Sequence, residues 1–277
     1  MEEINIKKML MAKNPKSAKK IPNFVYWLLS RLLCVKKINA FLREHGHEYG
    51  IEFVRSILFD LSHVTLTAKG EENIPDEGKL VFASNHPLGG LDGLAFINVV
   101  YSKREKITFP VNDFLTFISN FEEFFIPVNK VGANSRNASA TIQQAFESEN
   151  TILMFPAGLC SRKKKRKIVD LEWKKTFIKQ AVLTERDVVP VYVNGRNSRF
   201  FYNVANLRKF FKIKFNIEML LLPRELFKQK GKALELCIGK PIPWQTFDKS
   251  KSEKEWAALL KEHVYKLSED PNTTFNY

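Results

Sequence analysis

Cysteine is scarce in this chain of 277 residues: three cysteines, at positions 34, 160 and 237, are scattered along it. An odd, widely spaced set without a Cys-x-x-Cys pair argues against a disulfide framework and against a structural zinc site. Scattered free thiols are typical of proteins in a reducing compartment. Hydrophobic residues make up 44% of the chain, so it can bury a core without such cross-links.

Long hydrophobic runs are also missing near the N-terminus. The longest, from Phe24 to Cys34, is interrupted by Arg31 and falls well short of the roughly 20 residues that a helix needs to cross a bilayer. Lysines precede any apolar stretch and no small-residue cleavage site follows, which argues against a signal peptide. The sequence therefore predicts a cytoplasmic protein.

Acidic residues are outnumbered, with 30 Asp and Glu against 44 Lys and Arg, which gives a formal net charge of +14. Such a field favours an anionic partner. Phenylalanine is abundant, with 23 residues. Phe together with Lys fits insertion at a membrane surface better than the reading of nucleic-acid grooves, which relies on Arg. We therefore expect an anionic membrane surface as a partner, and no nucleic acid.

The first 60 residues fit such a contact. Residues 1–60 form a basic N-terminal tail followed by amphipathic helical segments. The segment from Phe24 to Leu33 is apolar and aromatic, and it is flanked by Lys and Arg on both sides. This composition is typical of a helix that lies in the plane of a membrane surface. Packing against the main domain is the alternative. A helix in the membrane plane predicts a peripheral or monotopic protein at the cytoplasmic face of the inner membrane.

Strand and helix patterns alternate from residue 79 onward. Apolar runs predict strands at 79–84, 107–111, 124–128, 151–155, 188–193, 213–222 and 233–238. Helical patterns lie at 92–103, 113–121, 135–148, 173–185, 199–210 and 252–268, the last opening with a capping box. Alternation of this kind predicts an α/β fold with a mostly parallel central sheet and helices on both faces. Residues 61–277 are predicted to form this domain.

The stretch Asn85-His86-Pro87-Leu88-Gly89-Gly90-Leu91-Asp92 follows the first of these strands. In a regular strand His86 and Asp92 would be about 20 Å apart, and in a regular helix they would not share a face. The Pro and Gly residues between them permit a bend that lets the carboxylate reach the imidazole. A histidine oriented by a carboxylate is a general base for activating a hydroxyl or amine. We therefore predict that His86 and Asp92 form a catalytic pair.

Three later loops also follow apolar strands. One carries Gly158, which allows close backbone approach, then Ser161 and Arg162, which can contact an anion. Another carries Lys130, with Arg136 shortly after it, and a Val-Pro-Val strand at 189–191 ends in a polar turn. If the strands are parallel, these loops leave the sheet at the same edge as His86.

In their order and residues these stretches resemble the glycerolipid acyltransferases, the lysophosphatidic-acid-acyltransferase-like family, over roughly residues 65–245. The family's Asn-His-x4-Asp block corresponds to Asn85, His86 and Asp92, although here five residues separate His86 from Asp92. Its other blocks correspond to Ile126–Lys130, to Phe155-Pro156 with Gly158 and Ser161, and to Val189-Pro190-Val191.

Two departures concern the residues that the family uses for a phosphate-bearing acceptor. In the third block Ala157 replaces the family glutamate, and Arg162 lies two positions beyond that block's arginine. In the second block Lys130 stands for a different family arginine. The variant His-Pro-Leu-Gly-Gly-Leu-Asp resembles the hemolysin-like bacterial subgroup, which is similar to the O-acyltransferases of ornithine and glycine lipids. The resemblance implies transfer of a fatty acyl group to the hydroxyl of a lyso-aminolipid; a 1-acylglycerol-3-phosphate acyltransferase is the alternative.

This resemblance also implies the partners. The donor is an acyl thioester of acyl carrier protein or coenzyme A, used as a co-substrate, and neither a metal nor another cofactor is expected. Asn85, Lys130, Arg136, Gly158, Ser161 and Arg162 are predicted to bind substrate, and amides near Gly158 to stabilise the oxyanion.

Two rival hypotheses remain open at this stage. Cys160, in a cationic setting, is a candidate nucleophile with His86 as its base. A basic membrane-binding protein without enzymatic activity explains the charge, but not the bend that joins His86 to Asp92. His263, in the last predicted helix, is expected at the surface.

Overall fold

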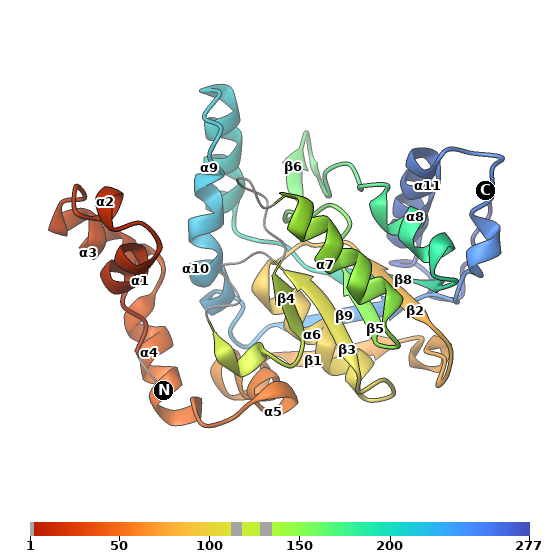
Figure 1. Cartoon of the computed structure of the whole chain (residues 1–277), viewed down its shortest axis with the longest axis horizontal. Helices are drawn as coiled ribbons and strands as arrows, with labels where there is room; N and C mark the ends of the chain where they lie inside the picture. The colour runs from red at the N-terminus through yellow and green to blue at the C-terminus, as the bar shows by residue number, and fades with distance from the viewer. Residues whose placement is uncertain (1–2, 112–117, 128–134) are drawn as a thin grey trace.

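The computed structural model describes residues 3–111, 118–127 and 135–277. Its centre is a seven-stranded sheet in the order β1-β9-β8-β2-β5-β3-β4, crossed by helices in Figure 1. Neighbouring strands pair in parallel except β8 with β9, which are antiparallel. The strands of this sheet are β1 (Thr65–Lys69), β2 (Leu80–Ser84), β3 (Ile107–Val111), β4 (Phe125–Pro127), β5 (Thr151–Met154), β8 (Asp187–Asn194) and β9 (Ala233–Ile238).

Helices cover both faces of this sheet. The faces can be followed on β2, where Leu80 and Phe82 belong to one buried cluster and Val81 and Ala83 to the other. A strand buried on both sides is a continuous apolar run, which is why β2 shows no polar alternation. The first cluster includes residues of α5 (Gly50–Arg55), η1 (Ser56–Leu61) and α6 (Gly90–Tyr101); the second includes residues of α7 (Ser135–Glu147), α8 (Thr176–Leu183) and α11 (Glu253–Lys266).

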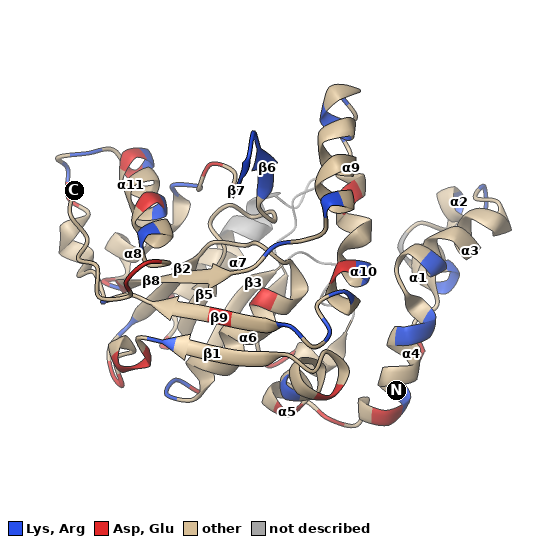
Figure 2. Ribbon diagram, turned by 180° about the vertical axis from the view of Figure 1, so that it is seen from behind, with Lys and Arg blue, Asp and Glu red and all other residues tan. Residues whose placement is uncertain are grey.

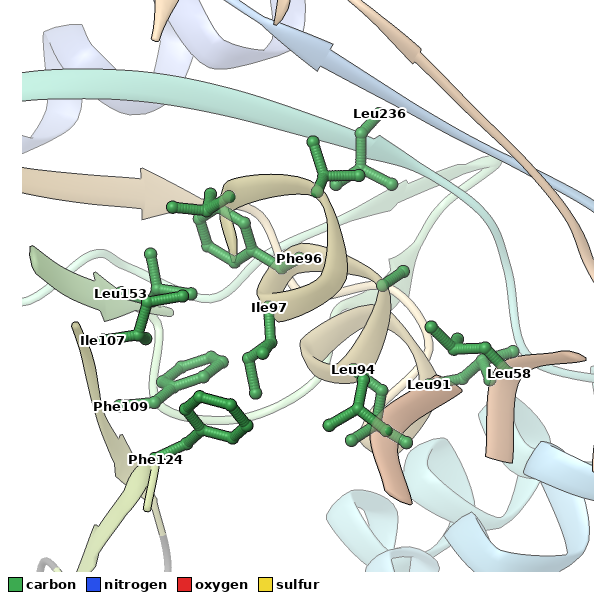
Figure 3. Close-up of a cluster of buried hydrophobic side chains, with 14 of the residues drawn as sticks. Leu58, Leu91, Leu94, Phe96, Ile97, Ile107, Phe109, Phe124, Leu153 and Leu236 are labelled. Atoms are coloured by element: carbon green, nitrogen blue, oxygen red, sulfur yellow. The ribbon is translucent and has the colours of Figure 1, made fainter. Parts of the chain in front are cut away.

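Helix α6 is fixed to the sheet by aromatic packing, shown in Figure 3. The Phe96 ring lies edge-on to Phe82 of β2 at 6.2 Å and to Phe109 of β3 at 6.1 Å. Leu91 and Leu94 of the same helix are buried too. Because edge-to-face rings favour one geometry, this contact fixes the rotation of α6. The first turn of α6 therefore has a defined position at the end of β2.

The N-terminal residues form helices with a small core of their own. These helices are α1 (Ile6–Lys13), α2 (Pro15–Ala18), α3 (Asn23–Leu32) and α4 (Val35–His45). Ile6, Tyr26, Leu33 and Val35 pack together, and Leu220 joins them from the main body. Helix therefore begins at residue 6, within the segment expected to be a basic tail. In the described part of the chain, no helix is both long and apolar enough to span a membrane.

The α/β fold with a mostly parallel sheet is confirmed, and most predicted elements occur within a few residues of their expected bounds. The strand predicted at 213–222 is wrong. This segment lies between α9 (Arg199–Phe210) and α10 (Leu222–Phe227) and contains η5 (Ile217–Leu221), a 3-10 helix. No strand of the described sheet pairs with it, so its alternating apolar and polar residues do not form part of a sheet.

Two smaller expectations also need correction. Of the helix predicted at 113–121, residues 113–117 lie outside the described residues, and the remainder contains the single 3-10 turn η4 (Ser119–Phe121). His263 is buried in α11 and packs edge-on against the Phe275 ring, with centroids 5.2 Å apart. Burial and nearby Lys266 lower the pKa of His263 to about 4, so it is a neutral core residue rather than a surface one.

Candidate active site

The bend predicted between His86 and Asp92 is present. β2 ends at Ser84, and α6 begins at Gly90, so the segment between them reverses direction at the carboxyl edge of the sheet. Gly89 has φ +96°, a conformation that strains any residue with a Cβ, and a Cβ there would also meet the Leu222 side chain at 2.9 Å. The glycine therefore makes the turn possible.

His86 and Asp92 contact each other despite the five residues between them. The His86 Nδ1 atom lies 3.1 Å from Asp92 Oδ2. The same oxygen accepts the backbone N–H of Leu88 at 2.7 Å, while Oδ1 accepts the N–H of Gly93 at 2.9 Å. Asp92 is fully buried and lies in the first turn of α6, where the positive end of the helix dipole stabilises a carboxylate. The longer bend thus preserves the predicted pair.

This geometry fixes the protonation pattern of the imidazole. An ionised carboxylate only accepts hydrogen bonds, so Nδ1 of His86 carries the proton that faces Asp92. The other ring nitrogen, Nε2, is then the basic atom of the neutral ring. Burial by itself lowers the pKa of His86, but the Asp92 carboxylate and the neighbouring Cys160 outweigh it and raise the pKa well above 6.5. His86 is therefore a strong base held by a buried carboxylate.

Two further side chains contact the His86 ring. The Phe155 ring, directly after β5, stacks on the imidazole with centroids 3.9 Å apart and an angle of 16°. The buried Cys160 thiol lies near the imidazole and contributes to its raised pKa. Phe155, in the loop after β5, and Asp92, in α6, therefore both fix the orientation of the imidazole.

The main chain of His86 is held by Asp170, a residue that the sequence did not point to. Its Oδ1 atom accepts the His86 N–H at 3.2 Å and the Ser161 hydroxyl at 2.5 Å. The Ser161 N–H donates to the His86 carbonyl at 2.7 Å. Trp173 Nε1 donates to the other carboxylate oxygen of Asp170 at 2.9 Å. Asp170 lies more than 80 residues from His86, so no local spacing could have revealed it.

Asn85 and Gly158 have internal partners. The Asn85 amide donates to the Val193 carbonyl at 2.9 Å and accepts the Val193 N–H at 2.7 Å, which extends the β2–β8 pairing beyond the strand end. Gly158, at φ +64°, donates its N–H to the Phe155 carbonyl at 2.9 Å and forms a tight turn. These contacts favour a positioning role for both residues over direct substrate contact. Stabilisation of an oxyanion by amides near Gly158 stays a prediction.

Arg162 also points inward. It opens the hairpin formed by β6 (Arg162–Lys164) and β7 (Lys167–Val169), and its Nη2 lies 2.7 Å from Glu218 Oε1. Glu218 is fully buried, and its other oxygen lies 2.9 Å from Arg208 Nε. The Arg162 guanidinium is thus committed to joining the hairpin to η5 and α9. Ser161 is similarly committed to Asp170, so neither contact supports the predicted binding of substrate.

Lys130 and Arg136 are the remaining two predicted binding residues. Lys130 lies outside the described residues. Arg136 lies in the first turn of α7, and its side chain is outside the described part as well.

An α/β sheet with a buried His–Asp pair at the carboxyl ends of its strands is an arrangement found in enzymes that activate a nucleophile by removing its proton. Comparison with known families identifies which one. The acyltransferase family profile matches residues 8–273, so this chain belongs to the acyltransferase family and is an acyltransferase. The resemblance inferred from the four motif blocks is thereby confirmed.

Curated relatives and one solved structure agree with this family. The chain is 44% identical over 266 residues, 95% of each chain, to the lyso-glycine lipid O-acyltransferase of Phocaeicola vulgatus. It is 44% identical over 265 residues, 95% of this chain and 97% of the relative, to the protein of the same name from Bacteroides thetaiotaomicron. The crystal structure of the 1-acyl-sn-glycerophosphate acyltransferase from Thermotoga maritima shares its fold, with a TM-score of 0.50 and 15% identity over 87% of this chain and 95% of that one.

Proposed function

We propose that this enzyme is an O-acyltransferase that moves a fatty acyl group from an acyl thioester to the hydroxyl of a lyso-glycine lipid. The observation that carries the proposal is the buried His86–Asp92 pair at the carboxyl edge of the sheet. Two relatives that are 44% identical to nearly the whole chain have names that state this acceptor. Lyso-ornithine lipid and 1-acylglycerol-3-phosphate are the alternative acceptors.

In the proposed reaction His86 acts as the general base. Its Nε2 removes the proton of the acceptor hydroxyl as the oxygen attacks the thioester carbonyl carbon. Asp92 holds the Nδ1 proton and stabilises the imidazolium that forms. The tetrahedral intermediate then expels the carrier thiolate, and the imidazolium returns the proton to that sulfur. The products are the acylated lipid and the free thiol of the carrier.

We further propose that the enzyme works at the cytoplasmic face of the inner membrane as a peripheral or monotopic protein. Phe24 and Trp27 of α3 are 68% and 62% exposed, and Arg31 lies over the Trp27 ring. Phe210 and Phe211, at the end of α9, are 78% and 63% exposed. Large apolar side chains exposed together among cations are typical of membrane-surface contacts.

The experiment that tests this function uses the purified protein, a labelled acyl thioester and a panel of three acceptors. We expect acylation of N-(3-hydroxyacyl)glycine at a rate at least tenfold above that of lyso-ornithine lipid and lysophosphatidic acid. Preferential acylation of lysophosphatidic acid would replace the proposed acceptor with the phosphate-bearing alternative. Acylation of none of the three would contradict the proposed acceptor and both alternatives.

A further inference from the structure

A strongly basic cavity of 410 Å³ lies beside the catalytic loop. Three segments line it: the β6–β7 hairpin, the connection from β8 into α9, and the connection from α10 to β9. Figure 2 shows the hairpin almost entirely in the colour of Lys and Arg, and it packs on α9. The cationic side chains that line the cavity are Lys163, Arg166, Arg196, Arg199, Lys228 and Lys232.

Most of this positive charge has no compensation within the described chain. The carboxylate of Glu225 lines the cavity but is already engaged, because Lys228 lies 2.8 Å from it and Ser198 donates two hydrogen bonds to it. Among the described residues, the other five cations have no acidic side chain at ion-pair distance. Like charges gathered in one concavity repel each other until an anion binds.

Arg199 adds a second sign of anion binding. It is the first residue of α9, a helix of 12 residues, and so lies at the positive end of the helix dipole. A basic residue there is unfavourable for the helix, whereas a bound anion at the same place is favourable. The arrangement therefore costs stability in the free protein and gives affinity for a negatively charged group.

Asn197 connects the cavity to the catalytic loop and indicates what else the ligand carries. Its Nδ2 donates to the carbonyl of Pro87, the residue after His86, at 3.1 Å. Its Oδ1 is buried and has no hydrogen-bond partner in the described part of the chain. A buried acceptor without a partner is costly, so a ligand with an N–H group would be favoured here. The cavity thus offers cations for a phosphate and an acceptor for an amide, next to His86.

We propose that this cavity binds the phosphate end of the 4′-phosphopantetheine arm that carries the acyl thioester, with Asn197 accepting a hydrogen bond from an amide of the arm. Both coenzyme A and acyl carrier protein present this arm. The inference rests on the proposed use of an acyl thioester donor. In coenzyme A this end of the arm is a diphosphate with two negative charges, which five uncompensated cations fit better than the single carboxylate of a glycine-lipid acceptor; in acyl carrier protein it is a phosphodiester with one charge.

The test compares S-acyl-4′-phosphopantetheine with S-acyl-pantetheine, which lacks only the phosphate, as donors for the full-length enzyme. We expect the wild type to prefer the phosphorylated donor at least tenfold in kcat/KM. The double variant R196Q/R199Q should lose most of this preference through the KM of the donor, with the KM of the lysolipid unchanged. The variant K240Q/K249Q removes the same charge from exposed positions that do not line the cavity, and it should keep the preference.

Other outcomes would overturn the assignment. Equal use of the two donors by the wild type would show that the phosphate is not recognised. A rise in the lysolipid KM of R196Q/R199Q would assign the cavity to the acceptor carboxylate instead. Acyl-coenzyme A and acyl carrier protein should be affected alike, and an effect on the carrier protein alone would assign the cations to its acidic surface. Calorimetric titration with coenzyme A measures binding without turnover. Salt-sensitive binding that R196Q/R199Q loses would support the cavity assignment even if the proposed acceptor is wrong.

Discussion

Asp92 determines the properties of His86, the proposed base. It accepts hydrogen bonds from the His86 ring and from the backbone of Leu88 and Gly93, so its carboxylate cannot turn away without breaking the bend that contains it. Stacking on Phe155 fixes the imidazole plane from the opposite side. The base is therefore oriented before any substrate binds, which reduces the reorganisation needed during the reaction.

The raised pKa of His86 predicts the pH dependence of activity. Only the neutral imidazole can accept the hydroxyl proton, and the pKa of His86 is held well above 6.5. Activity should therefore increase with pH through a range above the ordinary histidine pKa. The acid limb of kcat/KM against pH measures this, and a limb at or below pH 6.5 would contradict it.

Replacing Asp92 separates the two effects of the carboxylate. In D92N only Cys160 still offsets the burial of His86, so the pKa of His86 falls and the acid limb should move to lower pH. At the same time the rate on the plateau should fall by about 10²- to 10⁴-fold, because the tautomer is no longer fixed. A fall in rate without movement of the limb would mean that Asp92 only supports the fold.

Cys160 provides a test of the covalent alternative, since its thiol also contacts His86. If His86 activates the acceptor hydroxyl directly, C160S should retain most of the wild-type kcat. Intact-protein mass spectrometry after mixing the wild type with donor alone should then show no acyl adduct. Loss of turnover in C160S together with an adduct on the wild type would establish a cysteine nucleophile.

Among single residues, the sequence predicted the His86–Asp92 contact but not the side chains that hold it in place. Pro and Gly residues between His86 and Asp92 signal a bend, and a bend is a local property. Asp170 and Glu218 act through contacts with residues 84 and 56 positions away in the chain, which local patterns do not encode. Arg162 was expected to face an anionic substrate because exposed and buried arginines look alike in a sequence.

Among the helices and strands, too, a local signal gave a correct prediction, whereas an element fixed by long-range contacts was predicted wrongly. The final helix was predicted from its capping box, and both hydrogen bonds of that box are present between Ser252 and Glu255. The segment 213–222 has the alternation of a strand but is not one. Its one aromatic residue, Phe215, is exposed, and the buried Glu218 fixes the segment to two arginines instead of to a neighbouring strand.

Glu218 should be essential to the stability of the α9–η5 region. In E218A the Arg162 and Arg208 guanidinium groups lose a fully buried partner, with ion-pair distances of 2.7 and 2.9 Å in the wild type. Leaving buried charge uncompensated costs about 3–5 kcal/mol. Equilibrium unfolding in denaturant measures this loss. The control E149A removes an exposed partner of Lys79 and should leave the unfolding midpoint nearly unchanged; equal effects of the two variants would contradict the argument.

Over the whole molecule, exposed aromatic residues and uncompensated cations occur in neighbouring elements. Leu32, at the end of α3, packs in the same buried cluster as Phe201 of α9. Figure 1 shows α9 projecting from the body of the protein. Phe210, Phe211 and Phe215 are exposed among lysines there. This surface suits an enzyme whose acceptor is dissolved in a membrane.

The end of α9 is therefore predicted to contribute to membrane binding. Transfer of a Phe side chain from water is worth about 1.5–3 kcal/mol, so F210S/F211S should bind anionic vesicles at least tenfold more weakly than the wild type. Vesicle co-sedimentation measures this, and L183S, which removes a 64% exposed side chain from α8, is the control. Equal loss in both variants, or in neither, would contradict this prediction.

The central claim is that His86 is the base of an acyl transfer reaction, and the most direct test is the rate of labelled acyl transfer to N-(3-hydroxyacyl)glycine by wild type and H86A. H86N, which keeps a polar side chain there, and a thermal melt separate loss of chemistry from loss of fold. The account predicts that both folded variants are slower by about 10³-fold or more. Undiminished transfer by a folded H86A enzyme would contradict it.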